Sequence, residues 1–256
     1  MLAIVGIAGA LVATASGRRT GTLPLRAEFE WRFSVQQDDS TCPTGMPALA
    51  ICQPHSSTGV VSGLGRVSLS YVYAVFAAPS CLGSSAQVLG YSARFNVHGR
   101  GEVDLAVAGL PDCFPTPSAA IQSTTQPFTV TGGSGEYAGA SGSGTVMHTG
   151  APGLAGTHGR DLWAGTLVVQ GLEFDVTPPT ITGATNRAVR ASRRPAPVRV
   201  RYRVAASDAG KAASVTCRPP SGSFFKVGKT QVTCTAGDTH GNSAIRSFTI
   251  TVTRRR

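Results

Sequence analysis

Six cysteines carry the clearest chemical signal in this 256-residue sequence: Cys42, Cys52, Cys81, Cys113, Cys217 and Cys234. Four lie before residue 175 and two after it, and no pair has C-x-x-C spacing. Even numbers without metal-ligand spacing favour disulfides over zinc, and disulfides persist in oxidising compartments. The sequence leaves the three possible pairings of the first four open, although short spacing favours Cys42–Cys52 and Cys81–Cys113.

The other reactive side chains do not fall into catalytic or metal-binding spacings. The histidines show no i, i+4 or H-x-H arrangement, which argues against a metal centre. Ser141 lies in Gly-Ala-Ser-Gly-Ser, which lacks the last glycine of a G-x-S-x-G nucleophile turn. No Gly-Lys-Ser/Thr follows the glycine-rich run near it, so no phosphate-binding loop is predicted. We therefore expect no catalytic residue, metal or cofactor, and an enzyme is the less favoured class.

The segment Asp238-Thr-His-Gly-Asn242 has two interpretations. Aspartate and asparagine can cap backbone amides of a turn, or their oxygens can bind calcium. Calcium requires about 6–8 oxygen ligands and few carboxylates are nearby in the sequence, so the turn is favoured.

Charge is distributed unevenly along the chain. Residues 1–174 hold 8 Lys/Arg and 10 Asp/Glu, for −2, whereas residues 175–256 hold 15 and 3, for +12; together they give the net +10. Such a field attracts polyanions of the cell envelope or extracellular space, although a basic surface can simply aid solubility. No segment interleaves aromatics with Lys/Arg, so nucleic acid is a disfavoured partner. The candidate polyanion contacts are Arg187, Arg190, Arg193, Arg194, Arg254, Arg255 and Arg256.

The elements that must position these residues are predicted to be β-strands. Residues 25–35 alternate, with Phe29, Trp31 and Phe33 on one face and Glu30 and Arg32 on the other. Further strands are expected near residues 67–73, 88–98, 102–108, 128–131, 145–148 and 161–173, with a polar loop at 36–58. At least six consecutive antiparallel strands indicate a barrel or sandwich. Glu30 and Arg32 are candidate polar groups of a hollow barrel; alternatively they face solvent, or the barrel is packed solid.

The two ends of the first domain are marked by composition. Residues 1–13 are apolar and lead into the motif Ala13-Thr14-Ala15, which predicts a signal peptide over 1–15. No Lys or Arg precedes the apolar run, and a buried strand is the alternative. No other apolar run approaches the ~20 residues that span a bilayer, so no transmembrane span is expected. Pro178-Pro179 interrupts sheet pairing, which places a boundary near residue 175. The expected domains are therefore 20–174 and 175–256.

The C-terminal region contains an ordered set of residues: Asp175, Pro178-Pro179, Ile181, Ala206, Asp208, Val215-Thr-Cys217, Pro220-Ser-Gly-Ser223, Phe225, Val227-Gly228, Thr230, Val232-Thr-Cys-Thr-Ala236, Asp238, Gly241-Asn242, Phe248 and Val252. With this set, the region resembles the HYR (hyalin repeat) module, an extracellular Ig-like family associated with adhesion. Many members have a further cysteine pair, where this chain has Gly183 and Arg246. The resemblance thus implies a Cys217–Cys234 bridge.

Two motifs stand out in the N-terminal region: the run Phe128–Val146, which contains Gly-Gly-Ser-Gly-Glu-Tyr-Ala-Gly-Ala-Ser-Gly-Ser-Gly, and Trp163-Ala-Gly-Thr-Leu167. With these motifs, the region resembles the small barrel of the allene oxide cyclase/dirigent type found in secreted bacterial proteins. Glycines inside strand pairs permit the bulges and coiling of a narrow barrel. No catalytic residue of that family matches a position in this sequence.

Together these observations predict an all-β protein: a small antiparallel β-barrel followed by an Ig-like β-sandwich. We expect a secreted, non-catalytic binding or adhesion protein whose basic module contacts anionic polymers. The alternative is a barrel enzyme or dirigent-like protein, of cyclase or isomerase type, that acts on an apolar small molecule.

Overall fold

The protein is built from strands throughout the residues that the structure describes. The computed structural model describes residues 18–32, 42, 44–46, 50–76, 80–81, 85–110, 112–115, 122–150, 158–191, 197–209 and 213–254. No helix occurs among them, which confirms the all-β prediction, and correspondingly no described helix could cross a bilayer. The expected signal peptide lies outside these residues.

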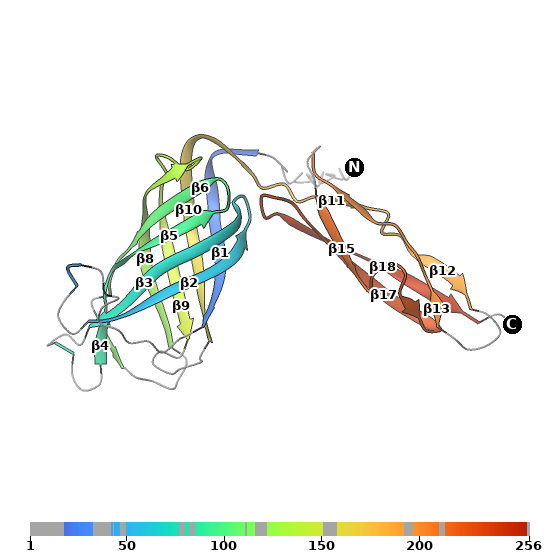
Figure 1. Ribbon diagram of the computed structural model, residues 1–256, viewed down its shortest axis with the longest axis horizontal. Helices are drawn as coiled ribbons and strands as arrows, with labels where there is room; N and C mark the ends of the chain where they lie inside the picture. Colours follow the sequence, from blue (N-terminus) through green and yellow to red (C-terminus); the bar gives the residue numbers. More distant parts are fainter. Residues whose placement is uncertain are drawn as a thin grey trace, which may run out of the picture.

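The first sheet forms a nearly closed antiparallel barrel (Figure 1). Its strands are β1 (Arg18–Arg32), β2 (Ile51–Val61), β3 (Gly65–Phe76), β4 (Ser85–Val88), β5 (Tyr91–Val97), β6 (Gly101–Val107), β7 (Cys113–Pro115), β8 (Gln122–Gly135), β9 (Ser141–Gly150) and β10 (His158–Asp175). The order is β1-β10-β9-β8-β6-β5-β3, with β2 on β3, and β4 and β7 continue from β3. The edges β1 and β2 meet closely, since a Cβ on Gly59 would lie 3.1 Å from the Glu28 carbonyl oxygen.

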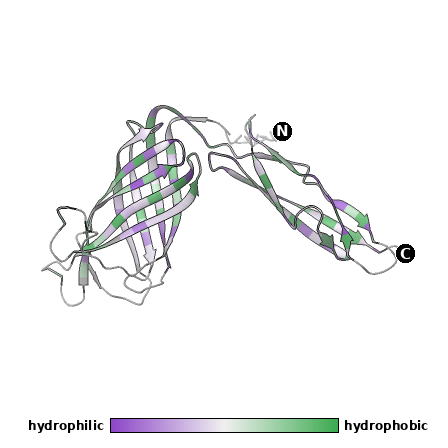
Figure 2. Cartoon of the chain, viewed as in Figure 1, coloured by the Kyte–Doolittle hydropathy of each residue, from purple (hydrophilic) through white to green (hydrophobic). Residues whose placement is uncertain are grey.

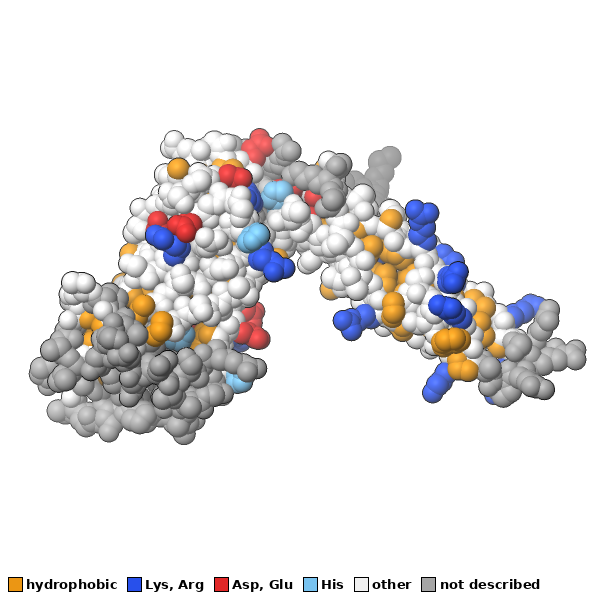
Figure 3. Space-filling model, viewed as in Figure 1, with side chains coloured by type: hydrophobic (Ala, Val, Ile, Leu, Met, Phe, Trp, Pro, Cys, Tyr) orange, Lys and Arg blue, Asp and Glu red, His pale blue; other side chains and the backbone are white. Residues whose placement is uncertain are grey.

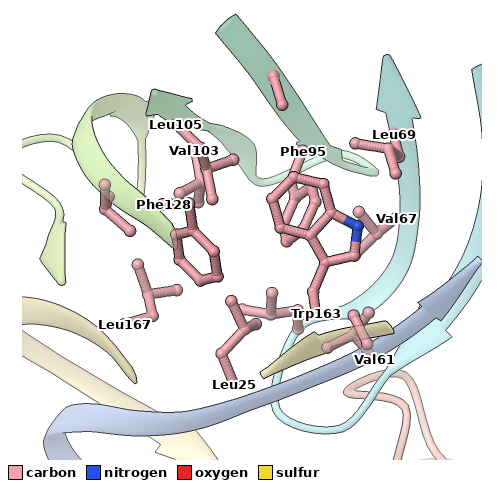
Figure 4. Packing of buried hydrophobic residues seen from close by; sticks show 14 of the residues in the cluster. Leu25, Val61, Val67, Leu69, Phe95, Val103, Leu105, Phe128, Trp163 and Leu167 are labelled. Atoms are coloured by element: carbon pink, nitrogen blue, oxygen red, sulfur yellow. The ribbon is translucent and has the colours of Figure 1, made fainter. Parts of the chain in front are cut away.

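The packed half of the barrel interior is aromatic and aliphatic. Burial alternates along the strands, as in the alternating buried and exposed residues of β5, and hydrophobic and hydrophilic residues intermingle along the barrel ribbons in Figure 2. Trp163 of β10 packs on Phe95 and Phe128, with ring centroids 5.2 and 5.4 Å away (Figure 4). Phe29 of β1 joins Phe95 at 5.5 Å. This part of the lumen is therefore filled with side chains, as the solid-barrel alternative anticipates.

The segment expected to be a loop at 36–58 contains a strand instead. β2 begins at Ile51 and passes through Pro54, which stands opposite Val72 of β3. Proline lacks an N–H and is tolerated in edge strands. Because β2 hydrogen-bonds on one side only, to β3, the proline costs it no ladder bond on the side toward β1. The composition of residues 36–58 predicted a loop, but pairing with β3 makes the part from Ile51 onward a strand of the barrel.

Disulfides lie near the end of the barrel where β4 and β7 extend the sheet. Cys42 pairs with Cys52, and Cys81 pairs with Cys113. These are the two pairings favoured by sequence spacing.

The second body is an Ig-like sandwich. Its strands are β11 (Thr180–Thr182), β12 (Arg187–Arg190), β13 (Val198–Arg199), β14 (Ala205–Ser207), β15 (Ser214–Arg218), β16 (Phe224–Phe225), β17 (Gly228–Gly237) and β18 (Ser243–Thr253). β12-β18-β17-β15 form the largest sheet, and β11-β14 and β13-β16 form two small ones. Tyr202 packs edge-on against Phe248 at 5.1 Å in the core, and the expected Cys217–Cys234 bridge joins β15 to β17.

Candidate functional site

A buried carboxylate, Asp161 of β10, is the centre of a polar cluster in the barrel. It accepts hydrogen bonds from Trp31 Nε1 of β1 at 2.8 Å, from the Tyr71 hydroxyl of β3 at 2.6 Å and from His148 Nδ1 of β9 at 2.7 Å. The Asp161 side chain is fully buried. Three donors satisfy most of the acceptor capacity of an ionised carboxylate, which is the condition for keeping such a charge in a barrel interior.

Sheet register explains how these side chains meet. Asp161 stands opposite His148 on one side and Phe29 on the other. Trp31 is two residues beyond Phe29 on the same face, so its indole lies beside Asp161. The indole occupies space left by two glycines: a Cβ on Gly159 would lie 1.9 Å from its ring, and one on Gly150 would lie 2.6 Å away.

Hydrogen bonds join Tyr91, His148 and Asp161 into a chain. Because a carboxylate only accepts hydrogen bonds, the geometry suits an imidazole that donates through Nδ1–H to Asp161. In that tautomer of the neutral ring, Nε2 accepts a hydrogen bond from the Tyr91 hydroxyl at 2.6 Å. The chain Tyr91–His148–Asp161 therefore links a phenol, an imidazole and a carboxylate, an arrangement that can relay a proton or hold a ligand's polar group.

Burial keeps the phenols of this cluster neutral. Desolvation raises the pKa of Tyr71 and Tyr91 well above the usual range, and the nearby Asp161 charge raises them further. Desolvation also raises the pKa of Tyr73 to about 12. All three tyrosines keep their hydroxyl protons at physiological pH, which argues against nucleophilic attack by a phenolate. Because Tyr71 and Tyr91 already direct their protons at Asp161 and His148, their oxygens offer a ligand acceptor sites rather than donors.

His55 of β2 completes the aromatic wall. It stacks on Tyr71 with centroids 4.8 Å apart and meets Trp31 edge-on at 5.0 Å. Burial lowers the pKa of His55 to about 4, a shift that the Asp161 charge partly opposes. The imidazole is therefore neutral at physiological pH and acts as a flat aromatic surface.

The His55 pKa predicts a pH-dependent stability. The folded pKa lies below the unfolded value of 6.5, so the unfolded chain binds the additional proton as pH falls from about 6.5 to 4. Acidification through this window should lower the free energy of unfolding by about 2–3 kcal/mol through this group. Urea titrations between pH 4 and 7 measure the slope, and His55→Gln should flatten it. The exposed His98 is the control, and an equal flattening in His98→Gln would contradict the assignment.

A hollow of about 1190 Å³ adjoins the cluster where β3–β5 pairing ends. The inward-facing His55, Tyr71 and Tyr91 line it, together with Ser92 and Arg94, which point to the outer face. The hollow is therefore bordered by residues from both the inner and the outer face of the barrel sheet, and it is not enclosed within the lumen. Its volume is sufficient for a small organic molecule, since ligand pockets occupy about 300–1,000 Å³.

The sequence identified the two faces of β1 but neither which of them turns inward nor the polar group that matters. In the structure Phe29 and Trp31 point inward, and Phe33 lies outside the described residues. Glu30 is exposed on the opposite face, next to the outer ion pair of Glu28 and Arg160 at 3.0 Å, so its assignment to the lumen is wrong. The strand alternation that turns two aromatics inward must turn Glu30 outward. The backbone of Arg32 belongs to β1, and its side chain lies outside what the structure describes.

Asp161 was missed, although a signal was present. It has the same strand parity as Trp163, Leu167 and Val169, all buried. A carboxylate at an inward position of an otherwise apolar strand face indicates a buried, partnered charge.

The outer surface of the sandwich is basic. Ten described Lys/Arg side chains are exposed there: Arg187, Arg190, Arg199, Arg201, Arg203, Arg218, Lys226, Lys229, Arg246 and Arg254. Figure 3 shows Lys and Arg side chains along the visible face of the sandwich. Asp175 and Asp208 are buried and Asp238 is half-buried, so no described carboxylate of this segment is exposed. Of the predicted contacts, Arg193, Arg194, Arg255 and Arg256 lie outside the described residues.

This Ig-like body, with its basic surface and its single described disulfide, matches a known protein family. Residues 174–252 match the HYR domain family. The HYR domain covers the sandwich from the last residues of β10 to β18, as the sequence resemblance implied. HYR domains are extracellular, adhesion-type modules, and the three disulfides are consistent with secretion. No curated protein matches the chain.

Proposed function

We propose that this is a secreted, non-catalytic binding protein with two domains, a barrel of residues 20–174 and a basic HYR domain of residues 175–256. In this proposal the HYR domain contacts anionic polymers of the cell envelope or extracellular space. The observation that carries the proposal is the uncompensated surface charge: ten exposed cations and no exposed carboxylate among the described residues of that domain. Such a field concentrates polyanions near the surface and speeds association, and salt screens it.

One row of cations offers a direct test. Arg199, Arg201 and Arg203 are exposed and alternate with the inward-facing Val200 and Tyr202, so the three guanidinium groups share one face. Replacing all three with glutamine removes three charges without changing the core. We expect this variant to bind immobilised dextran sulfate at least about tenfold more weakly at low ionic strength than the parent chain.

The measurement is retention of the full chain on dextran sulfate beads during a rising NaCl gradient. A matched control replaces three exposed barrel arginines, Arg26, Arg66 and Arg160, and should elute closer to the parent. Absent retention, or retention that does not weaken with salt, would contradict polyanion binding. Equal loss in both triple variants would point to net charge alone and would contradict the HYR surface as the site.

A second candidate function rests on the Asp161 cluster. Aromatic walls from His55, Tyr71 and Tyr91 border the hollow, and the Tyr91–His148–Asp161 chain supplies aligned donors and acceptors. These features favour a barrel that binds, or acts as a cyclase-, isomerase- or dirigent-type protein on, an apolar small molecule. Calorimetry with 2-naphthol as the probe tests it: we expect binding to the parent chain that is lost in Tyr91→Phe. A ligand that binds both proteins equally would remove the cluster from the proposal.

A further inference from the structure

We propose that the HYR domain binds Ca²⁺ through Asp175, Asp208 and Asp238. These residues bring one carboxylate oxygen each to within 4.8 Å of one another. They come from the end of β10, from the residue after β14 and from the turn between β17 and β18. The site is independent of the polyanion proposal, because it involves none of the exposed cations.

The composition of the domain makes this convergence unusual. Residues 175–256 contain 15 Lys/Arg and only 3 Asp/Glu, and those three are Asp175, Asp208 and Asp238. Carboxylates that served solubility would be spread over the surface among the cations. Here all of them meet at one end of the domain, and Asp175 and Asp208 are only 8% and 3% exposed. Mutual repulsion opposes such a cluster unless a cation offsets it.

A second observation points to a ligand. Asp208 Oδ2 is buried and has no hydrogen-bond partner among the described residues. An unpartnered buried carboxylate oxygen is strongly unfavourable, and a bound ion is one of the few ways to satisfy it. This oxygen belongs to a side chain that contributes to the three-carboxylate cluster.

The remaining contacts hold the carboxylates in place. Asp238 Oδ1 accepts the His240 and Asn242 amides, both at 2.8 Å, and Oδ2 accepts Asn242 Nδ2 at 2.9 Å. Because a carboxylate has about four acceptor sites, these bonds leave room for a metal. His240 Nδ1 lies 3.8 Å from Asp175 Oδ2, and a single imidazolium can offset at most one of three negative charges.

The donor set selects the cation. Three carboxylates without cysteine are hard oxygen ligands, which suit Ca²⁺ or Mg²⁺ rather than zinc. Ca²⁺–oxygen distances of about 2.3–2.6 Å allow ligands on opposite sides of the ion to be up to about 5 Å apart, which accommodates a 4.8 Å limit. Mg²⁺ at about 2.1 Å requires a tighter octahedron. The extracellular setting of HYR domains favours calcium at affinities of about 10⁻⁴–10⁻³ M.

The turn Asp238–Asn242, which carries one of the three carboxylates, also contacts the barrel. The Ser62 hydroxyl hydrogen-bonds Asn242 Oδ1 at 2.6 Å, and the Gly63 amide donates to the His240 carbonyl at 2.8 Å. Asn242 Nδ2 in addition donates to the Asp175 carbonyl at 2.9 Å. An ion that fixes Asp238 and its turn therefore stabilises the contact between the two domains.

The test is calorimetric titration of the chelator-treated full chain with CaCl₂, with MgCl₂ as a parallel arm. We expect a single site with a Kd of about 10⁻⁴–10⁻³ M for Ca²⁺, and Mg²⁺ binding at least about tenfold weaker. Asp208→Asn keeps the side-chain shape and removes the unpartnered charge, and should weaken Ca²⁺ binding at least about tenfold. Asp104→Asn on the barrel surface is the matched control and should bind like the parent.

The proposal fails if the parent chain binds no Ca²⁺ up to 10 mM, which is roughly tenfold above the weakest expected Kd, or if it binds Mg²⁺ with equal affinity. It also fails if Asp208→Asn leaves Ca²⁺ binding intact, or if Asp104→Asn weakens Ca²⁺ binding as much as Asp208→Asn does. Circular dichroism of Asp208→Asn without calcium shows whether it folds. We expect that it does, since the amide relieves a buried charge. If it does not, Asp175→Asn takes its place and must show the same loss of Ca²⁺ binding.

Discussion

Replacing Asp161 with alanine is expected to lower the free energy of unfolding of the barrel by about 3–5 kcal/mol, the typical cost of breaking a buried, hydrogen-bonded charge network. The substitution leaves Trp31 Nε1, the Tyr71 hydroxyl and His148 Nδ1 without their common acceptor. All three are held in the barrel interior, where water replaces the lost acceptor poorly.

Urea denaturation followed by tryptophan fluorescence measures this effect. Both tryptophans of the chain, Trp31 and Trp163, belong to barrel strands, so the signal reports the barrel and not the HYR domain. Asp161→Asn should be milder than alanine, because its amide oxygen still accepts while its NH₂ opposes one donor. Asp104, exposed and paired with Arg94 at 2.7 Å, is the control; its replacement should cost less than about 1 kcal/mol. A loss at Asp161 no larger than at Asp104 would show that the network is not structurally important.

Trp163→Ala is expected to destabilise the barrel by about 3–5 kcal/mol, because it removes the largest side chain of a well-packed core and leaves a cavity. Trp163 is 1% exposed and contacts Phe95 and Phe128, as Figure 4 shows. Trp31 remains as the fluorescent reporter. Val60→Ala, at a side chain of barrel strand β2 that is 66% exposed, is the control and should cost less than about 0.5 kcal/mol.

Trp163→Phe separates packing from polarity at the same position. Trp163 Nε1 is buried and has no hydrogen-bond partner among the described residues. Phenylalanine keeps most of the aromatic contact and removes the unpartnered N–H, so we expect a loss below about 1.5 kcal/mol. If Trp163→Phe is as destabilising as Trp163→Ala, the indole nitrogen has a bonding role that this packing argument omits.

The barrel and the HYR domain differ in where their acidic and basic side chains lie. Among the described barrel residues, the carboxylate of Asp161 is buried among hydrogen-bond donors, while the partly exposed Asp104 and Glu102 pair with Arg94 on the outer face. In the HYR domain, the cations occupy the surface and the acids converge at one end. The first arrangement suits a small-molecule site, and the second suits a polyanion surface with a metal beside it.

The sequence by itself determined the fold class, the alternation of β1, the HYR resemblance and the excess of positive charge, because each depends on neighbouring residues or on totals. Period-two patterning places Phe29 and Trp31 on one face of β1 whatever the partner strands are, and a bridge between Cys217 and Cys234 needs only the pairing of strands close in sequence.

Only the tertiary structure decided the two sites. Asp161, Trp31, Tyr71 and His148 come from four strands and meet because barrel closure and register set their positions. Asp175 and Asp208 likewise meet Asp238, although they lie 63 and 30 residues before it in the sequence. Read locally, Asp238 lacked the carboxylates that calcium needs; folding supplies them, because contacts between distant residues are set by strand pairing and not by spacing along the chain.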